Sequence, residues 1–184
     1  MGRARRIIET NRTYHIFTRC RNCENYFEDK CFKNVIIKKL NYVKKVYKFD
    51  INAFVIMPNH IHLAITTTND EHTISKIMQL LKSMIAKEMN RLLGLKGPFW
   101  NERFGSRLVY YFPALCSYFA KNPLKWGLVK CASEWEFGSY EVYRRKNGKC
   151  PIEITLHKHF LNLGNTIEEC INAQLKIDEY FMCA

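Results

Sequence analysis

Residues 50 to 68 restrict the fold most, because they contain two apolar, β-forming segments joined by a very short polar connection. "DINAFVIM" (50–57) and "IHLAITTT" (61–68) each have the composition of a strand, and "PNH" between them predicts a tight turn. Such a connection favours two neighbouring antiparallel strands. The histidines of this stretch stand at the start of the second strand.

Periodicity predicts the remaining elements on either side of this pair. Alternation predicts two further strands, over 13–20 and 107–112. Apolar residues at helical spacing predict long helices over 28–49 and 72–93, the second stopped by Gly94. A short helix is expected over 113–122, running into Pro123, and a last amphipathic helix over 165–181.

The predicted order is β-α-β-β-α-β-α, which defines the fold class as α+β. The economical solution is an antiparallel sheet of the ferredoxin-like or RRM-like kind, with helices on one face. Residues 1–146 are expected to form one catalytic domain, and residues 147–184, where the composition becomes polar, a C-terminal helical appendage.

His60 and His62 form a His-x-His pair within the predicted third strand. Side chains alternate in a strand, so both imidazoles point the same way, about 6.6 Å apart along the backbone. Both can then reach one cation, while Ile61, Leu63 and Ile65 fill the opposite face. Taken alone, the same spacing also suits two solvent-satisfied imidazoles.

Tyr118 and Asn122 are four residues apart in the predicted short helix and therefore project from the same face. The Asn122 amide oxygen is an acceptable ligand for a hard divalent ion, Mg²⁺ or Mn²⁺, beside the two histidines. Such a metal would polarise a phosphodiester and favour attack by Tyr118. The alternative for Tyr118 is an ordinary packing aromatic.

The charge indicates a polyanionic partner. Lys and Arg number 29 against 17 Asp and Glu, a formal charge of +12, which suits a phosphate polymer. For any single lysine, a solvated helix face is the preferred interpretation. The candidate DNA-binding residues are Arg3, Arg5, Arg6, Arg19, Lys38, Lys39, Lys44, Lys45 and Arg103.

The cysteines and the hydropathy indicate the cellular compartment. The sequence has neither a membrane-spanning apolar run nor a signal-peptide pattern, so we expect a cytoplasmic, bacterial-type, nucleoid-associated protein with reduced thiols. Cys20 and Cys23 form a CxxC without a partner pair, which favours unligated thiols over zinc. A second His-x-His, at His157 and His159, has a lysine between its histidines and is not expected to bind metal.

Five ordered blocks carry a family resemblance: "TYHIFTR", "INAFVIMPNHIHLAI", "FWNERF", "YFAKNPLKWGLV" and "EWEFGSY". Together they resemble the REP-associated tyrosine transposases, within the single-tyrosine His-hydrophobe-His (HUH) transposases. The similarity covers roughly residues 3 to 143. Two departures are Cys20, where relatives often have Gly, and Trp126, where they usually have a small residue.

The resemblance implies a metal-dependent endonuclease and strand transferase that cuts single-stranded DNA beside hairpins through a 5′-phosphotyrosine. It makes Tyr118 the nucleophile and His60, His62 and Asn122 the metal ligands. Relatives include monomers and dimers, so either state is open.

Two other interpretations of the function stay open. One is a domesticated protein that binds a hairpin without cutting it, for which basic residues and a four-stranded sheet suffice. The other is a metal-dependent hydrolase that uses the histidines but not the tyrosine. Retention of all four residues, His60, His62, Tyr118 and Asn122, favours the transposase.

Overall fold

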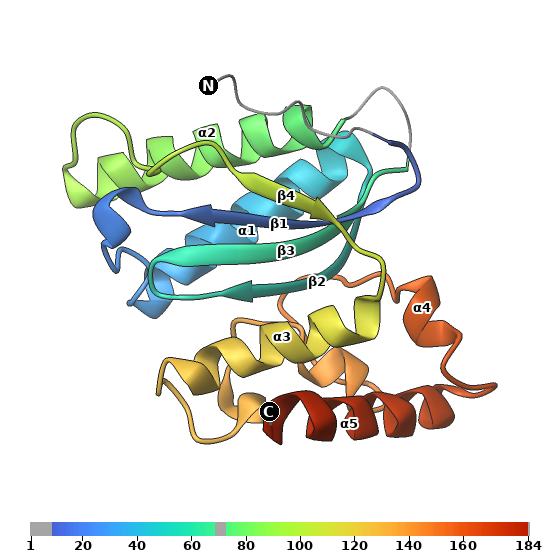
Figure 1. The fold of residues 1–184 in the computed structure, drawn as a ribbon. Helices are drawn as coiled ribbons and strands as arrows, with labels where there is room; N and C mark the ends of the chain where they lie inside the picture. Colours follow the sequence, from blue (N-terminus) through green and yellow to red (C-terminus); the bar gives the residue numbers. More distant parts are fainter. Residues whose placement is uncertain (1–8, 69–72, 184) are drawn as a thin grey trace, which may run out of the picture.

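The computed structural model describes residues 9–68 and 73–183, and Figure 1 shows a four-stranded sheet surrounded by helices. The strands are β1 (Thr13–Arg19), β2 (Asp50–Ile56), β3 (His60–Thr66) and β4 (Gly105–Leu108). The α-helices are α1 (Lys30–Tyr47), α2 (Ile74–Leu93), α3 (Phe112–Lys125), α4 (Lys158–Leu161) and α5 (Ile167–Cys183). Short 3₁₀ turns η1 (Arg21–Cys23), η2 (Ala132–Glu134) and η3 (Glu141–Tyr143) lie in the connections.

The sheet has the strand order β2-β3-β1-β4, and every neighbouring pair is antiparallel. The β2–β3 turn is closed by a hydrogen bond of 2.8 Å from the Met57 N–H to the His60 carbonyl. Both central strands, β3 and β1, have partners on each side, so their backbone groups are paired within the sheet. The predicted α+β class and antiparallel ferredoxin-like sheet are confirmed.

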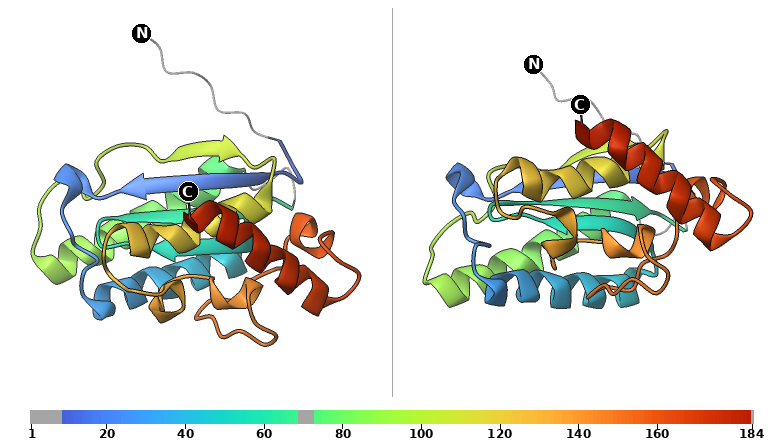
Figure 2. Two further views of the ribbon diagram at one scale, coloured as in Figure 1. Left: turned by 60° about the horizontal axis from the view of Figure 1, so that its bottom comes forward. Right: turned by 90° about the horizontal axis from the view of Figure 1, so that it is seen from below.

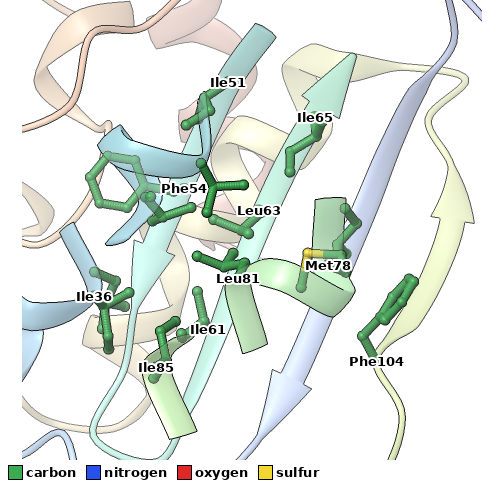
Figure 3. Close-up of a cluster of buried hydrophobic side chains, with 14 of the residues drawn as sticks. Ile36, Ile51, Phe54, Ile61, Leu63, Ile65, Met78, Leu81, Ile85 and Phe104 are labelled. Carbon is green, nitrogen blue, oxygen red and sulfur yellow. The ribbon is translucent and has the colours of Figure 1, made fainter. Parts of the chain in front are cut away.

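The first face of the sheet packs against α1 and α2 and forms the main core (Figure 3). Every second strand residue points to this face, because side chains alternate in a strand. These residues contact the apolar stripe of each helix, whose members recur every three or four residues. The side chains gathered there include Ile36, Phe54, Ile61, Leu63, Leu81 and Ile85.

The second face is partly covered by α3, which in turn packs against α5, and Figure 2 shows these two helices on the side of the sheet opposite α1 and α2. The expectation of helices on one face therefore holds only for α1 and α2. The reason lies in strands β2 and β3: Ala53 and Val55 of β2 and Ala64 of β3 face away from the main core and are buried against Phe112, Cys116 and other residues of a second apolar cluster. An apolar second face must be covered, and α3 covers it.

The fourth strand was predicted over 107–112, and this range is wrong. The structure has β4 at Gly105–Leu108, and α3 already begins at Phe112 with Pro113 in its first turn. Tyr110 and Tyr111 therefore lie in the connection. Aromatic residues favour strands on average, but helix initiation at Pro113 requires the chain to turn before it.

Capping residues locate the ends of the helices more closely than the apolar pattern does. Asp29 caps α1 by accepting a hydrogen bond of 2.9 Å from the Cys31 N–H, and Lys48 ends it in the left-handed conformation at φ 48°. Helix α2 begins after its N-cap Thr73 and stops at Gly94, φ 64°; the stop is as predicted. Helix α3 runs past Pro123 to Lys125 rather than stopping before the proline.

Residues after 146, expected to be an appendage, pack closely on the rest of the chain. The Thr155 N–H donates to the Ile51 carbonyl at 3.0 Å, and the Asn52 side chain donates to the Thr155 carbonyl at 3.0 Å. Further along, α5 packs along α3 (Figure 1). Among the described residues, no helix combines the length and the apolar character needed to cross a bilayer.

Candidate active site

The two histidines of β3 lie side by side on the second face of the sheet. The centroids of the His60 and His62 rings are 4.9 Å apart, and both side chains are buried. Ile61 and Leu63 point to the opposite face and join the main core. The structure therefore has the same-face arrangement that the spacing predicts.

His60 is oriented by the residue before it. Its Nδ1 lies 2.7 Å from the Oδ1 of Asn59, and the Asn59 amide donates from Nδ2 to the Cys23 carbonyl at 3.0 Å. An amide oxygen can only accept, so Nδ1 of His60 is the donor and carries the ring proton. Nε2 of His60 is then the nitrogen with a free lone pair.

His62 is oriented by a third histidine. Its Nδ1 lies 2.9 Å from Nε2 of His15, a residue of the neighbouring strand β1. Neither His15 nor Asn59 was among the site residues predicted from the sequence. The signal for His15 was present in "TYHIFTR", where alternation places His15 and Phe17 on the face opposite Tyr14 and Ile16.

Helix α3 brings Tyr118 and Asn122 across the sheet to these histidines. The Tyr118 ring meets that of His62 edge-on at 5.4 Å between centroids, and the phenol side chain is exposed. Asn122 is buried and donates from Nδ2 to the Tyr118 carbonyl at 2.7 Å. Its Oδ1 is not used in that bond. The four residues predicted from the sequence thus form one cluster.

Burial keeps both histidines of β3 neutral at physiological pH. It is the main cause that lowers the pKa of His60 to about 4; the Arg19 charge adds to this, and a hydrogen bond with Asn122 opposes it. The pKa of His62 is lowered further, to about 2, first by burial and then by His60, His15 and Arg19. A neutral imidazole is the form that ligates metal.

The donor set fits a hard divalent cation. Among residues 9–68 and 73–183, no three His, Cys, Asp or Glu side chains gather as potential ligands. A cation at this cluster would therefore use the imidazoles of His60 and His62 and the amide oxygen of Asn122. Partners on Nδ1 of both rings leave Nε2 for coordination, and the Asn122 oxygen is not engaged by Tyr118. These donors suit Mn²⁺ or Mg²⁺.

Trp126 flanks the cluster beside His60. It caps the C-terminus of α3, its ring centroid lies 5.5 Å from that of His60, and its side chain is 42% exposed. Tyr118, at 47% exposed, stands beside His62. Two accessible aromatic rings therefore border the buried histidine pair.

The predicted DNA-binding residues are scattered in the structure. Arg19 pairs with His60 across β1 and β3 and is exposed. Arg103 lies before β4 and lines a groove beside α2 together with Gln79 and Lys82. Three others, Arg3, Arg5 and Arg6, lie outside the described residues.

The four candidate lysines of α1 lie on the helix that covers the first face, so the structure does not bring them to the histidines. Two of them are in ion pairs. Lys39 lies 3.5 Å from the Glu88 carboxylate, and Lys44 lies 2.9 Å from that of Glu153.

The structure also shows what surrounds the second His-x-His pair and the CxxC motif. Nδ1 of His157 accepts a hydrogen bond of 3.0 Å from the His159 N–H, and its Nε2 lies 2.8 Å from the Thr13 hydroxyl, so both nitrogens are engaged. In the CxxC, Cys20 is buried and Cys23 exposed. Burial raises the pKa of the Cys20 thiol well above its ordinary value.

Comparison with known proteins identifies the family. The family model described as "Transposase IS200 like" matches residues 9–110, more than half of the chain. The chain belongs to this family of IS200-like transposases. The matched range contains the histidine pair and ends before Tyr118 and Asn122.

Within this class, the chain is similar to the REP-associated tyrosine transposase of Escherichia coli (strain K12), with 30% identity over 111 residues, 59% of this chain and 62% of that protein. A relative from Haemophilus influenzae is 24% identical over 106 residues, 51% of this chain and 60% of the relative. The chain thus spans about 60% of the length of these curated relatives. The predicted resemblance is confirmed.

A solved structure shares the fold. It is described as a REP-associated tyrosine transposase bound to a REP hairpin, and it matches with a TM-score of 0.68 and 23% identity. The match covers 86% of this chain and 96% of the other. The likeness therefore extends past the family-model match into the helices that follow β4.

Proposed function

We propose that this protein is a transposase that cuts and rejoins single-stranded DNA beside a hairpin, with Tyr118 as the nucleophile. The observation that carries the proposal is the placement of an exposed tyrosine 5.4 Å, between ring centroids, from a buried pair of neutral histidines. A tyrosine that only packed would gain nothing from exposure at this point. Membership of the IS200-like family supports the reaction class.

In the proposed reaction, the Tyr118 oxygen attacks the phosphorus of the scissile phosphodiester. A bond forms between that oxygen and phosphorus, and the bond from phosphorus to the 3′ oxygen breaks. The phenol proton leaves to solvent, and the departing 3′ oxygen takes up a proton to become a free hydroxyl. The 5′ phosphate stays on Tyr118, so attack by a 3′ hydroxyl can reverse the step without an external energy source.

The histidine pair and Asn122 serve the same step as a cation site. A divalent ion held there supplies Lewis-acid polarisation of the phosphate. The protein's contribution is to keep both imidazoles neutral by burial and to fix their rings through Asn59 and His15. The Tyr118 carbonyl fixes the Asn122 amide in turn.

The proposed partner is single-stranded or hairpin DNA, met in the cytoplasm. Support comes from the formal charge of +12 and from the similar fold of a transposase solved with a REP hairpin. Arg19 offers a positive charge next to the histidines. Trp126 offers an exposed ring on which a base of the cut strand could stack.

An adduct assay tests the proposal. Hairpin DNA with a labelled single-stranded flank is incubated with the protein and Mg²⁺ or Mn²⁺, and denaturing electrophoresis separates free from protein-linked DNA. We expect a labelled band that survives denaturant and disappears with EDTA. Protein that binds the hairpin yet forms no adduct and no nick would support the non-cleaving binder. Cleavage without an adduct would support a hydrolase.

A further inference from the structure

His15 contacts the candidate metal site without being a predicted ligand. It lies on β1, where it pairs with Ala64 of β3 on one side and Arg107 of β4 on the other. Its ring centroid is 5.1 Å from that of His62, and the two rings are joined through Nε2 of His15 and Nδ1 of His62 at 2.9 Å. A central strand thus holds a third imidazole directly behind His62.

Aromatic neighbours restrict the orientation of the His15 ring. Its centroid lies 5.7 Å from that of Phe17, 5.4 Å from that of Phe119 and 5.8 Å from that of Tyr118. The Phe119 and Tyr118 contacts are edge-on. A ring packed between β1 and α3 in this way is a rigid hydrogen-bond partner.

The direction of the bond between the two imidazoles follows from proton counting. One nitrogen must donate and the other accept. If Nε2 of His62 is to bind a cation, the ring proton of His62 sits on Nδ1, which donates to Nε2 of His15. His15 then carries its own proton on Nδ1. The opposite arrangement would put the proton of His62 on Nε2 and block coordination.

His60 has the equivalent partner in Asn59, whose amide oxygen accepts from Nδ1. Both histidines of the pair therefore have a hydrogen-bond partner at Nδ1, one an amide and one an imidazole. Metal-binding histidines commonly donate their other N–H to such a partner, which fixes both the tautomer and the ring orientation.

We propose that His15 is a positioning residue for the cation site: it accepts the Nδ1 proton of His62 and thereby directs Nε2 of His62 toward the metal. The inference rests on the proposed function, because it assumes that His62 is a ligand. His15 does not itself touch the cation or the DNA in this role.

The acceptor role requires a neutral His15, because a protonated ring would have no lone pair to offer Nδ1 of His62.

The test measures Mn²⁺ affinity by isothermal titration calorimetry on the full chain without DNA. His15→Phe keeps an aromatic ring and removes the acceptor, whereas His15→Gln places an amide oxygen close to the position of Nε2. We expect His15→Phe to weaken Mn²⁺ binding about 10-fold or more. We expect His15→Gln to recover most of the wild-type affinity. Thermal unfolding verifies that each variant is folded.

The matched control is His157→Asn. It also removes an imidazole that is hydrogen-bonded to β1, through Thr13, but it lies away from His62. We expect its Mn²⁺ affinity to equal that of the wild type. An equal loss in His15→Phe and His157→Asn would show general destabilisation and would overturn the inference.

Two further measurements separate this inference from the proposed function. Nitrogen chemical shifts of His62 in the metal-free protein report its tautomer: we expect the proton on Nδ1, and a proton on Nε2 would overturn the inference. Mn²⁺ binding by His60→Ala tests the site itself. If His60→Ala loses Mn²⁺ and His15→Phe does not, the role of His15 fails while the metal site stands. If His60→Ala binds like the wild type, the metal site fails too.

Discussion

The carboxylate of Asp178 in α5 accepts a hydrogen bond of 2.5 Å from the hydroxyl of Ser117 in α3, the residue directly before Tyr118. Arg144 donates to both oxygens of the same carboxylate at 2.7 Å, and Gln174 donates to it at 3.0 Å. The C-terminal helix is therefore tied by a buried polar network to the helix that carries the proposed nucleophile.

Asp178→Ala is expected to lower the free energy of unfolding by about 3 to 5 kcal/mol. The side chains of Arg144 and Asp178 are 3% and 7% exposed, so removal of the carboxylate leaves a buried guanidinium without its partner. Urea denaturation gives the value. The control is Glu168→Ala, which removes an ion pair with Lys146 and should change stability far less, because both partners are exposed to solvent. Similar values for both variants would contradict the prediction.

Tyr118→Phe should bind hairpin DNA and fold normally but form no covalent adduct. The change removes only the attacking oxygen and keeps the ring beside His62. Tyr110→Phe and Tyr111→Phe are the controls, since both residues are exposed, lie before α3 and should be dispensable. Mass spectrometry of digested adduct identifies the modified residue. A phosphonucleotide on a peptide without Tyr118 would refute the assignment.

His60→Ala and His62→Ala should each abolish cleavage and weaken Mn²⁺ binding. Hairpin affinity in EDTA should stay near the wild-type value, because the two buried rings offer little surface to DNA. Nicking assays and calorimetry measure the first two effects, and fluorescence anisotropy measures the third. Cleavage at the wild-type rate by either variant would exclude the proposed site.

Arg19→Ala should flatten the dependence of log K on log salt for hairpin binding by about 0.7 to 0.9, the value for one phosphate contact. Arg19 stands opposite His60 in the sheet and so lies beside the proposed cation site. The comparison variant neutralises Lys38, Lys39, Lys44 and Lys45 together. Because α1 covers the other face, the slope of log K against log salt should change less for each lysine removed than it does for Arg19. A larger loss per charge would show that the hairpin reaches α1.

The free energy of unfolding should fall as the pH drops from about 6.5 toward 4, in part because of His157. Burial, followed by the charges of His159 and Lys158, lowers the pKa of folded His157 from 6.5 to about 4. Between these values the unfolded chain binds a proton that the folded chain does not, so acid favours unfolding, by up to about 1.4 kcal/mol per pH unit. His157→Asn keeps a cap acceptor and should lose less stability between pH 7 and 5 in urea titrations. An unchanged pH dependence would contradict this assignment.

Much of the fold could be predicted because its signals are local. The turn between β2 and β3, the helical stripe of α2 and its stop at Gly94 each depend on residues close together in the chain. The same holds for His60 and His62, which share a face through the two-residue period of a strand. Tyr118 and Asn122 share one through the helical repeat.

The sequence by itself determined which residues share a face of each element, since the backbone period sets this within a few residues. It did not determine which faces meet. Coverage of the second sheet face by α3, the ties from Asp178 to Ser117, and the contact of His15 with His62 all join residues far apart in the chain. Only the tertiary structure decided them. The hydrophobic effect is non-directional, so it does not specify which apolar faces meet, and buried polar groups favour the arrangement in which each has a hydrogen-bond partner.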